Sequence, residues 1–234
     1  LSGLVGSEMC IRDRTRRIPN PDLRKKPPMV DFYLGLAGNF SREEGAMRPV
    51  LHRSTEKIRE SLQAFGLQAD RYTVIAPGAE YGPAKMWPPQ HVARLCQLIG
   101  QTVVLLASTK EKTLCASIAE IAPQADIQNL AGKTDLSQAL DLISAARDMV
   151  SNDSGLMHVA AALGVPQVAV FGSSSPKHTP PLSDKAHVIW LADDPSYLPV
   201  LDCAPCFDRT CRFGHTRCLN DVKPERVAQL LQSL

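Results

Sequence analysis

Short apolar runs alternate with amphipathic stretches over most of this chain, and that alternation constrains the fold more than any other feature. Strands are expected at 72–76, 102–107, 126–129, 147–151 and 167–171, and helices near 89–99, 111–121, 135–146 and 154–163. Strand–helix–strand units with short links form right-handed crossovers. The sequence therefore predicts an α/β domain built on a parallel sheet.

Further elements flank the alternating region. A helix is expected from Ser54 to Gly66, a strand at 187–191, and a last helix from Pro224 to Leu234. A short helix is expected around Asp31 to Ala37. The helix at 135–146 has one apolar stripe that predicts its buried face: Leu136, Ala139, Leu140 and Ile143.

The first residues do not look like a natural protein N-terminus. The run Leu4 to Arg14, L-V-G-S-E-M-C-I-R-D-R, looks like the translated end of a transposon-based sequencing adapter, and it lacks the features of a signal peptide. We therefore interpret residues 1–14 as an artefact, with native sequence from near Thr15 and the upstream part of a longer protein missing. The alternative is a genuine basic N-terminus.

Bulk composition is that of an ordinary soluble globular protein, with 44% hydrophobic and 21% charged residues. No apolar run approaches the roughly 18 residues that cross a bilayer. The net charge of +2 is too small to indicate a nucleic-acid partner. One basic run favours either contact with an anionic membrane surface or a solvated loop: Arg14, Arg16, Arg17, Arg24, Lys25 and Lys26.

Polar and glycine-rich residues follow the predicted strands. They are Pro77-Gly78, Ser108-Thr109, Leu130-Ala131-Gly132, Ser151-Asn152-Asp153 and Gly172-Ser173. Ligands of open parallel sheets bind outside the carboxyl ends of the strands. These residues therefore predict a binding face at one edge of the sheet.

The loop from Pro77 to Trp87, P-G-A-E-Y-G-P-A-K-M-W, follows the first strand of the sheet. Lys85 is suited to neutralising a phosphate, and the alternative is an ordinary surface lysine. Glu80 could orient backbone amides, accept from a sugar hydroxyl, or be a solvated acid. Trp87 is expected to pack under the loop. The candidate residues for a phosphate-bearing donor are Gly78, Ala79, Glu80 and Lys85.

The segment from Met149 to Leu163, M-V-S-N-D-S-G-L-M-H-V-A-A-A-L, places a helix N-terminus directly after a strand. Backbone N–H groups and the helix dipole favour phosphate there. Asp153 either caps the helix or accepts hydrogen bonds from amides or a sugar. Ser154 and Gly155 allow close approach of a ligand. His158 is either a packed residue or a functional one.

Two more loops are candidates for ligand contact. Thr134 and Lys133 could line a base or ribose pocket, and the hydroxyls that begin at Ser173 could bind a diphosphate or form a plain turn. The chain has no G-x-G-x-x-G after the first strand, no P-loop and no G-x-S-x-G. Dehydrogenase, P-loop and esterase functions therefore lose their usual support.

Four of the seven cysteines form a tight C-x2-C-x4-C-x6-C group: Cys203, Cys206, Cys211 and Cys218. They are enough for a structural metal site, but free thiols in a folded loop explain them equally well, and disulfides are a third interpretation. Cys96 and Cys115 fall on apolar helix faces and are expected in the core. No catalytic metal and no cofactor are expected.

Five ordered motifs resemble the ADP-heptose:lipopolysaccharide heptosyltransferases of glycosyltransferase family 9, and most closely their heptosyltransferase II branch. The motifs are P-G-A-E-Y-G-P-A-K-M-W-P at 77–88, N-L-A-G-K-T-D-L at 129–136, S-N-D-S-G-L-M-H-V-A-A-A-L at 151–163, G-S-S-S-P-K-H-T-P-P at 172–181 and C-A-P-C-F-D-R-T-C-R-F-G-H-T-R-C-L at 203–219. Met86 and Ser173 depart from the family pattern, where a basic residue and a proline are common.

The resemblance implies a GT-B arrangement of two facing Rossmann-like domains. Residues 15–66 would be the remnant of an acceptor domain and a linker, 67–222 the C-terminal nucleotide-sugar-binding domain, and 223–234 a C-terminal helix. It also implies that Lys85 contacts the donor phosphates and that Thr134 lies beside the adenine. The donor motif D-[ST]-G-L-x-H corresponds to Asp153, Ser154, Gly155, Leu156 and His158.

The implied reaction is inverting transfer of heptose from ADP-heptose to the inner core of lipopolysaccharide, in the cytoplasm or peripherally at the inner face of the inner membrane. The catalytic base would lie in the missing N-terminal part, so the chain alone is expected to bind donor and transfer nothing. The alternatives are a heptosyltransferase I or III step, another cell-surface glycan, or a non-catalytic nucleotide- or metal-binding module.

Overall fold

The computed structural model describes residues 28–36 and 48–234, which fall into two units. The unit Leu1–Ala46 has one described helix, α2 (Met29–Leu36), so the helix expected around Asp31 to Ala37 is confirmed. The suspected adapter segment and the basic run at 14–26 lie outside the described residues. None of the described helices is both long enough and apolar enough to cross a membrane.

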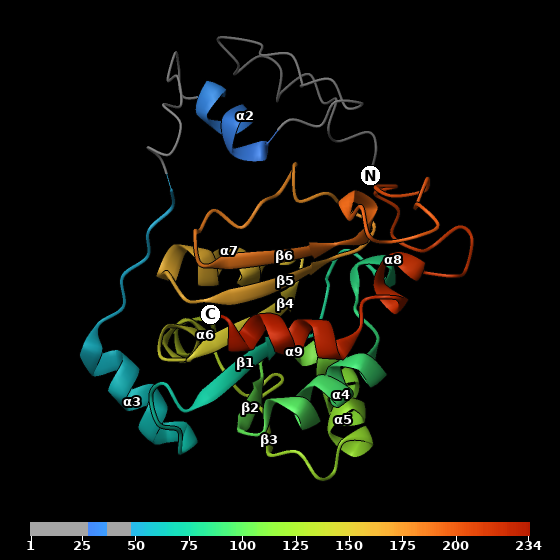
Figure 1. The fold of residues 1–234 in the computed structure, drawn as a ribbon. Coiled ribbons are helices and arrows are strands. Elements are labelled where there is room, and N and C mark those ends of the chain that lie inside the picture. Colours follow the sequence, from blue (N-terminus) through green and yellow to red (C-terminus); the bar gives the residue numbers. More distant parts are fainter. Residues whose placement is uncertain (1–27, 37–47) are drawn as a thin grey trace, which may run out of the picture. The chain divides into compact units, whose positions relative to one another are not determined.

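A six-stranded parallel sheet forms the centre of the unit Met47–Leu234 (Figure 1). Its strands are β1 (Tyr72–Ala76), β2 (Thr102–Leu105), β3 (Ile127–Asn129), β4 (Asp148–Asn152), β5 (Gln167–Phe171) and β6 (Ala186–Trp190). The spatial order is β3-β2-β1-β4-β5-β6, and each neighbouring pair is parallel. The predicted parallel α/β fold is confirmed.

The strand order reverses between β1 and β4, which fixes where a ligand is expected. The chain runs outward from β1 to β2 and β3, then returns to place β4 on the other side of β1. Ile75 pairs with Val150, and Ala76 pairs with Ser151, so the two strands end side by side. The loops that follow β1 and β4 diverge there and leave a crevice.

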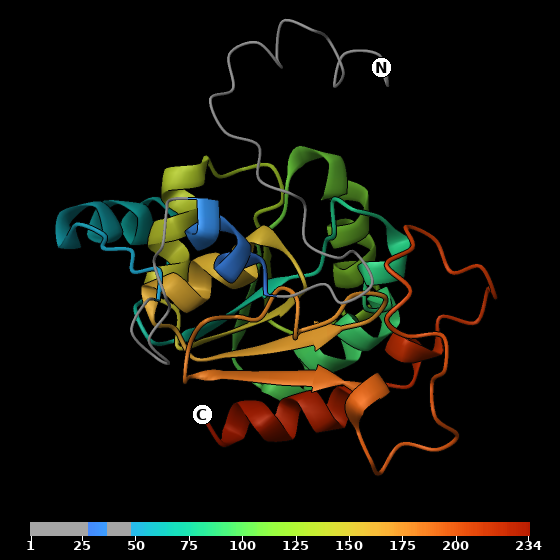
Figure 2. The same cartoon turned by 90° about the horizontal axis from the view of Figure 1, so that it is seen from above.

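Helices cover both faces of the sheet. One face carries α4 (Pro89–Ile99), α5 (Lys112–Ile121) and α9 (Pro224–Gln232), and the other carries α3 (Thr55–Phe65), α6 (Leu136–Ser144) and α7 (Gly155–Leu163). Figure 2 shows α7 and α9 on opposite sides of β5 and β6. The shorter helices are the 3-10 turns η1 (Pro83–Lys85), η2 (Thr109–Glu111) and η3 (Leu191–Asp193) and the α-helix α8 (Arg217–Asn220).

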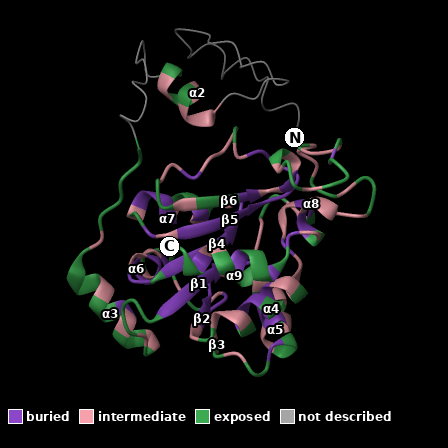
Figure 3. Cartoon of the chain, in the orientation of Figure 1, coloured by how far each residue is buried: buried purple, intermediate pink, exposed green. Residues whose placement is uncertain are grey.

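Because helices cover both faces of the sheet, its central strands are buried on both sides. Every residue of β1, β4 and β5 is buried (Figure 3). Alternate residues serve the two cores, because Ile75 packs with α4 and α5 while Val74 packs with α6. The expected burial of Trp87, Cys96 and Cys115 is confirmed.

Leu136 belongs to the apolar stripe that was predicted to be the buried face of α6, and for this residue the prediction is wrong. Leu136 is 70% exposed and Leu140 is half-buried, whereas Ala139 and Ile143 are buried. The reason is its position at the first residue of α6, directly after the N-cap Asp135, where the helix emerges from the loop. The side chain therefore faces a cavity instead of the sheet.

A buried carboxylate fastens the segment before the sheet to α6. Asp141 is buried and accepts hydrogen bonds from the Arg53 Nε at 2.7 Å and from the Ser61 hydroxyl at 2.8 Å. Both of its oxygens are thus occupied, which limits the cost of burying the charge. The contact holds α3 against α6 with fixed orientation.

Candidate functional site

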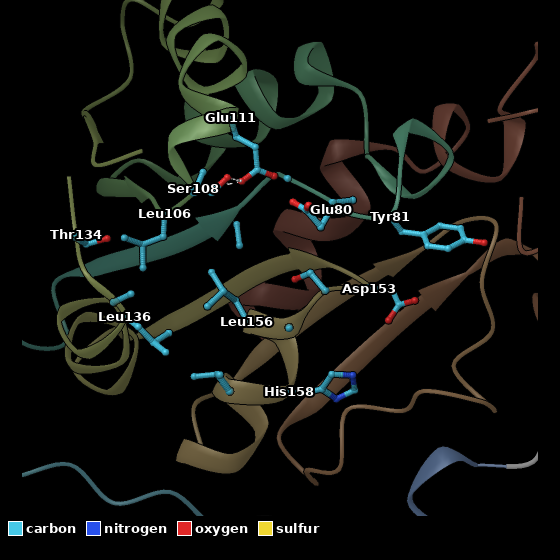
Figure 4. A pocket seen from close by; sticks show the side chains of 18 of the residues that line it. Glu80, Tyr81, Leu106, Ser108, Glu111, Thr134, Leu136, Asp153, Leu156 and His158 are labelled. Carbon is cyan, nitrogen blue, oxygen red and sulfur yellow. Dashed lines mark hydrogen bonds between the residues drawn. The ribbon is translucent and has the colours of Figure 1, made fainter. Parts of the chain in front are cut away.

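A cavity of about 800 Å³ opens at the carboxyl ends of the central strands. Its walls come from the loop after β1, the loop after β2, the start of α6 and the start of α7, as Figure 4 shows. This volume is in the range of sites for small molecules of roughly 300–1,000 Å³. The cavity therefore lies where the sheet topology predicts a ligand.

Most residues predicted from the sequence line this cavity. They are Gly78, Ala79, Glu80, Lys85, Thr134, Asp153, Ser154, Gly155, Leu156 and His158. Ser173 is not among them. It is buried beside a second, smaller cavity formed by the cysteine-rich loop. The structure thus brings together residues from three separate motifs and leaves Ser173 outside the cavity.

Lys85 and Asp153 form an ion pair at the floor of the cavity. The Lys85 Nζ lies 2.5 Å from the Asp153 Oδ2, and both side chains are largely buried. Asp153 also accepts from the Thr179 hydroxyl at 3.3 Å. The carboxylate is therefore directed at the lysine, and an anionic ligand would share or replace it as the partner of Lys85.

The aromatic ring of Tyr81 supports the same lysine. The Lys85 Nζ lies 5.2 Å from the centroid of the Tyr81 ring, and the Arg209 guanidinium lies 4.8 Å from it. The Tyr81 hydroxyl donates to the Phe207 carbonyl at 2.8 Å. The loop after β1 is thus joined to the segment that contains the four cysteines.

The N-terminus of α7 points donors at the cavity. Ser154 is the N-cap residue, yet its side chain makes no capping hydrogen bond. Within the described part of the chain, the buried Ser154 Oγ has no hydrogen-bond partner. The hydroxyl and the first N–H groups of the helix are consequently available to an anion.

His158 lies one turn into α7 and also lines the cavity. His158 is exposed toward the cavity; partial desolvation by the surrounding protein lowers its pKa below the ordinary value of 6.5, while Asp153 acts in the opposite direction and Lys85 in the same one. The imidazole is therefore neutral at physiological pH. A neutral ring close to Lys85 adds no positive charge to the site but offers a hydrogen-bond donor and an acceptor.

The far side of the cavity is apolar. It is formed by Leu106, Leu136, Ala139, Leu156 and Val159. Figure 4 shows Leu136 and Leu156 on the side away from Asp153. A ligand with one anionic end and one flat apolar end would match this division.

Glu111 is a wall residue that was not predicted. Its carboxylate accepts from the Ser108 N–H at 2.9 Å and from the Ser108 hydroxyl at 2.8 Å. A Cβ on Gly78 would lie 1.5 Å from the Glu111 Oε1, so Gly78 is required for this approach. The spacing S-T-K-E at 108–111 is a capping box, a signal that could have indicated the position.

Asn152 was also missed as a site residue, because it does not line the cavity. It hydrogen-bonds the loop after β1 that carries Lys85. Its amide donates to the Pro77 carbonyl at 2.7 Å, and its oxygen accepts from the Trp87 N–H at 3.1 Å. The Trp87 indole donates to the Val222 carbonyl. The loop that carries Lys85 is therefore tied to β4 and to the segment before α9.

No three His, Cys, Asp or Glu side chains within residues 28–36 and 48–234 are placed to hold a metal ion. Cys203, Cys206, Cys211 and Cys218 are free thiols. The structure thus offers the cavity a lysine, helix amides and hydroxyls as its groups for binding an anion.

The strand order and the cavity at its switch point define a Rossmann-type α/β domain. A family model described as glycosyltransferase family 9 (heptosyltransferase) matches residues 12–217. The chain belongs to glycosyltransferase family 9.

Curated relatives and solved structures agree with this assignment. Lipopolysaccharide heptosyltransferase 2 of Escherichia coli K12 is 41% identical over 228 residues, and the match covers 89% of this chain and 62% of that protein. Lipooligosaccharide heptosyltransferase 2 of Haemophilus ducreyi is 42% identical, with 89% and 63% covered. The chain therefore spans somewhat less than two thirds of the length of these relatives.

The structure of E. coli ADP-heptose LPS heptosyltransferase II matches with a TM-score of 0.72 and 37% identity, covering 92% of this chain and 64% of that one. The structure of E. coli heptosyltransferase WaaC with ADP has a TM-score of 0.59, 19% identity and coverage of 94% and 59%. At 19% identity, the similarity to WaaC concerns the fold alone.

Proposed function

We propose that this chain is the donor-binding part of an enzyme that transfers heptose from ADP-heptose to the inner core of lipopolysaccharide. The observation that carries the proposal is the cavity at the β1–β4 switch point, where Lys85 and the uncapped N-terminus of α7 face one site. Two relatives that are 41% and 42% identical are named heptosyltransferase 2, and one similar structure is that of an ADP-heptose LPS heptosyltransferase II.

The division of the cavity into a polar and an apolar side supports a proposed position for each part of the nucleotide sugar. The diphosphate lies between Lys85, the Ser154 hydroxyl and the first amides of α7. The adenine lies against Leu136 and Leu156, next to Thr134. Glu111 accepts from a ribose hydroxyl, because its carboxylate is fixed by Ser108 at the boundary between the polar and apolar walls.

Leaving-group stabilisation follows from the same contacts. Transfer of the sugar breaks its bond to the ADP oxygen, and negative charge develops on the diphosphate. Lys85 shifts from Asp153 toward that charge, and the amides of α7 are already oriented toward it. Deprotonation of the acceptor hydroxyl is assigned to a base supplied by the rest of the protein, as in the family pattern.

The acceptor is proposed to be the first heptose of the lipid-linked inner core, presented at the inner face of the inner membrane. The heptosyltransferase 2 relatives above favour this step, since heptosyltransferase 1 of Pseudomonas aeruginosa and heptosyltransferase 3 of E. coli are only 27% and 30% identical. Peripheral membrane contact belongs to the same proposal.

Calorimetric titration with ADP tests the donor site. The chain should bind ADP saturably, and Lys85→Ala should weaken binding by about 10- to 100-fold, because a charge-assisted hydrogen bond to phosphate is lost. Lys57→Ala is the matched control, since Lys57 is an exposed lysine paired with Glu60 on α3. Equal loss in both variants, or no saturable binding by the unaltered chain, would contradict the proposal.

Transfer itself is tested by adding ADP-heptose and a heptosyl acceptor to the chain. We expect binding without product, because the acceptor base is assigned outside this chain. Product formation by the chain alone would refute the assignment of the base but not that of the donor site.

A further inference from the structure

The four cysteines of the segment 203–218, here called the cysteine loop, are not used by the proposed function. All four are free, and they line one cavity of about 20 Å³ together with Ala84 and Ser173. That volume suits about one water molecule. Apart from the start of α8 at Arg217, the cysteine loop contains no helix or strand, so thiols facing a common space form much of its interior.

Cys211 has the environment of a reactive thiol. The backbone of Thr216, Phe213 and Gly214 and the hydroxyl of Thr216 act on the Cys211 sulfur as hydrogen-bond donors that lower its pKa. Burial acts to raise the pKa of Cys211, but these hydrogen bonds outweigh it and lower that pKa. Donors directed at the sulfur favour the thiolate, which is the nucleophilic form.

Cys218 has the opposite character. Burial raises the pKa of Cys218 to about 12, and the nearby Cys206, Cys203 and Cys211 raise it further. Cys218 is therefore a neutral thiol that lies within electrostatic range of the other three sulfurs. Cys218 lines the same small cavity as Cys211, and this shared position places its sulfur to react second, after Cys211 has been oxidised.

We propose that the cysteine loop is an oxidation site at which hydrogen peroxide or an organic hydroperoxide joins Cys211 to Cys218. The Cys211 thiolate attacks the O–O bond, which forms an S–O bond and releases hydroxide or alkoxide. The Cys218 sulfur then attacks the Cys211 sulfur, and the displaced hydroxide takes up the Cys218 proton as water. Two electrons leave the two cysteines, and the peroxide is reduced.

Metal coordination is the competing chemistry for four thiols. The four sulfurs line a common cavity, yet no three His, Cys, Asp or Glu side chains in the described ranges are placed to hold one ion. Sulfurs that surround a space without converging on a point favour reaction between pairs of thiols over coordination.

Oxidation would reach the donor site through the backbone. The Arg209 carbonyl accepts from the Ala84 N–H at 3.1 Å, and the Phe207 carbonyl accepts from the Tyr81 hydroxyl. Gly82, with φ of 149°, has its Cα so close to the Arg209 carbonyl that a Cβ would lie 2.5 Å from the oxygen. Drawing Cys211 toward Cys218 therefore moves the support of Lys85. This consequence rests on the proposed function.

Peptide mapping by mass spectrometry after peroxide treatment of the reduced 234-residue chain tests the site. We expect one disulfide, between Cys211 and Cys218. Cys211→Ser should form none, and Cys218→Ser should stop at a sulfenic acid on Cys211 that dimedone labels. Cys203→Ser is the matched control from the same cavity and should still form the disulfide. Cys96 and Cys115, which are buried in the core away from this cavity, should stay unmodified.

ADP titration before and after oxidation is the second readout. Affinity should fall on the order of tenfold and recover with dithiothreitol, as expected for the loss of about one charge-assisted contact. A disulfide with unchanged ADP affinity would overturn the link to Lys85. Stoichiometric zinc or iron in the purified chain with all four thiols protected, or a disulfide that persists in Cys211→Ser, would overturn the oxidation site.

The two proposals fail separately. If the reduced chain does not bind ADP but the mapped disulfide forms, the donor site is wrong and the oxidation site stands. If ADP binds and peroxide leaves all four thiols intact, only the oxidation site is wrong.

Discussion

At the scale of single residues, two leucines of the same helix have different roles. Leu136 and Leu142 both belong to α6, but Leu136 is 70% exposed in the wall of the cavity, and Leu142 is fully buried against the sheet. Leu136 is therefore expected to contribute to ligand binding, and Leu142 to the stability of the fold.

Leu136→Ala should weaken ADP binding by about fivefold, since roughly 1 kcal/mol of apolar contact with the base is lost. The free energy of unfolding should change little. Leu142→Ala is the counterpart, and it should lower that free energy by about 2–5 kcal/mol through the cavity it leaves. Calorimetry and urea denaturation measure the two quantities. A large loss of stability in Leu136→Ala would show that it belongs to the core.

His158 gives the chain a small dependence of stability on pH, because its side chain is exposed and solvent screens much of the effect. Its pKa is lowered in the folded state, so below the ordinary value of 6.5 the unfolded chain binds a proton that the folded chain does not. Stability is therefore present at neutral pH and is lost as the pH falls below about 6.5. His158→Gln should reduce this loss in urea titrations between about pH 7 and about pH 5.

Part of the dependence of the free energy of unfolding on pH should remain in His158→Gln. Burial also lowers the pKa of His91, which is unchanged in the variant. Identical slopes in the two proteins would mean that His158 takes up protons equally in both states.

The residue roles that the sequence left open depend on neighbours far along the chain. Lys85, Asp153 and Ser154 were found from their position at strand ends and a helix start. Glu111 reaches the cavity only because it folds back on Ser108 beside Gly78. Asn152 matters through the Pro77 carbonyl, which lies 75 residues away. The capping box of Ser108 and Glu111 is a local signal, but no local pattern encodes the contacts of Glu111 with Gly78 or of Asn152 with Pro77.

At the scale of helices and strands, periodicity was a reliable guide where burial is two-sided. The bounds of β1, β5 and α4 coincide with the expected ranges, since apolar runs and proline or glycine ends mark them. The short α8 and the 3-10 turns were not anticipated. Pieces of three or four residues have no period to detect, and their formation depends on tertiary contacts.

The contact between α3 and α6 predicts how element packing responds to charge removal. Asp141→Asn leaves Arg53 without its carboxylate partner and should cost about 3 kcal/mol in urea denaturation. Asp184→Asn is the control, because Asp184 pairs with Arg48 on the surface at 83% exposure and its loss should leave the free energy of unfolding almost unchanged. Similar losses of unfolding free energy in the two variants would mean that the buried ion pair of Asp141 stabilises the fold no more than a surface pair does.

At the scale of the whole molecule, the unit Met47–Leu234 contains both hydrophobic cores and every residue that lines the cavity. A chain that lacks residues 1–46 should therefore keep its melting temperature within about 2 °C and its ADP affinity within about twofold. Differential scanning calorimetry and titration check this. Unfolding of the shortened chain would show that the first unit supplies part of the core.

The most direct test is a crystal structure of the chain with ADP. The diphosphate should lie within hydrogen-bond distance of the Lys85 Nζ and of the first N–H groups of α7, with the adenine against Leu136. Lys85 should have moved from Asp153 toward the phosphate. A nucleotide bound elsewhere, or a diphosphate that leaves the Lys85–Asp153 pair untouched and contacts no amide of α7, would contradict the account.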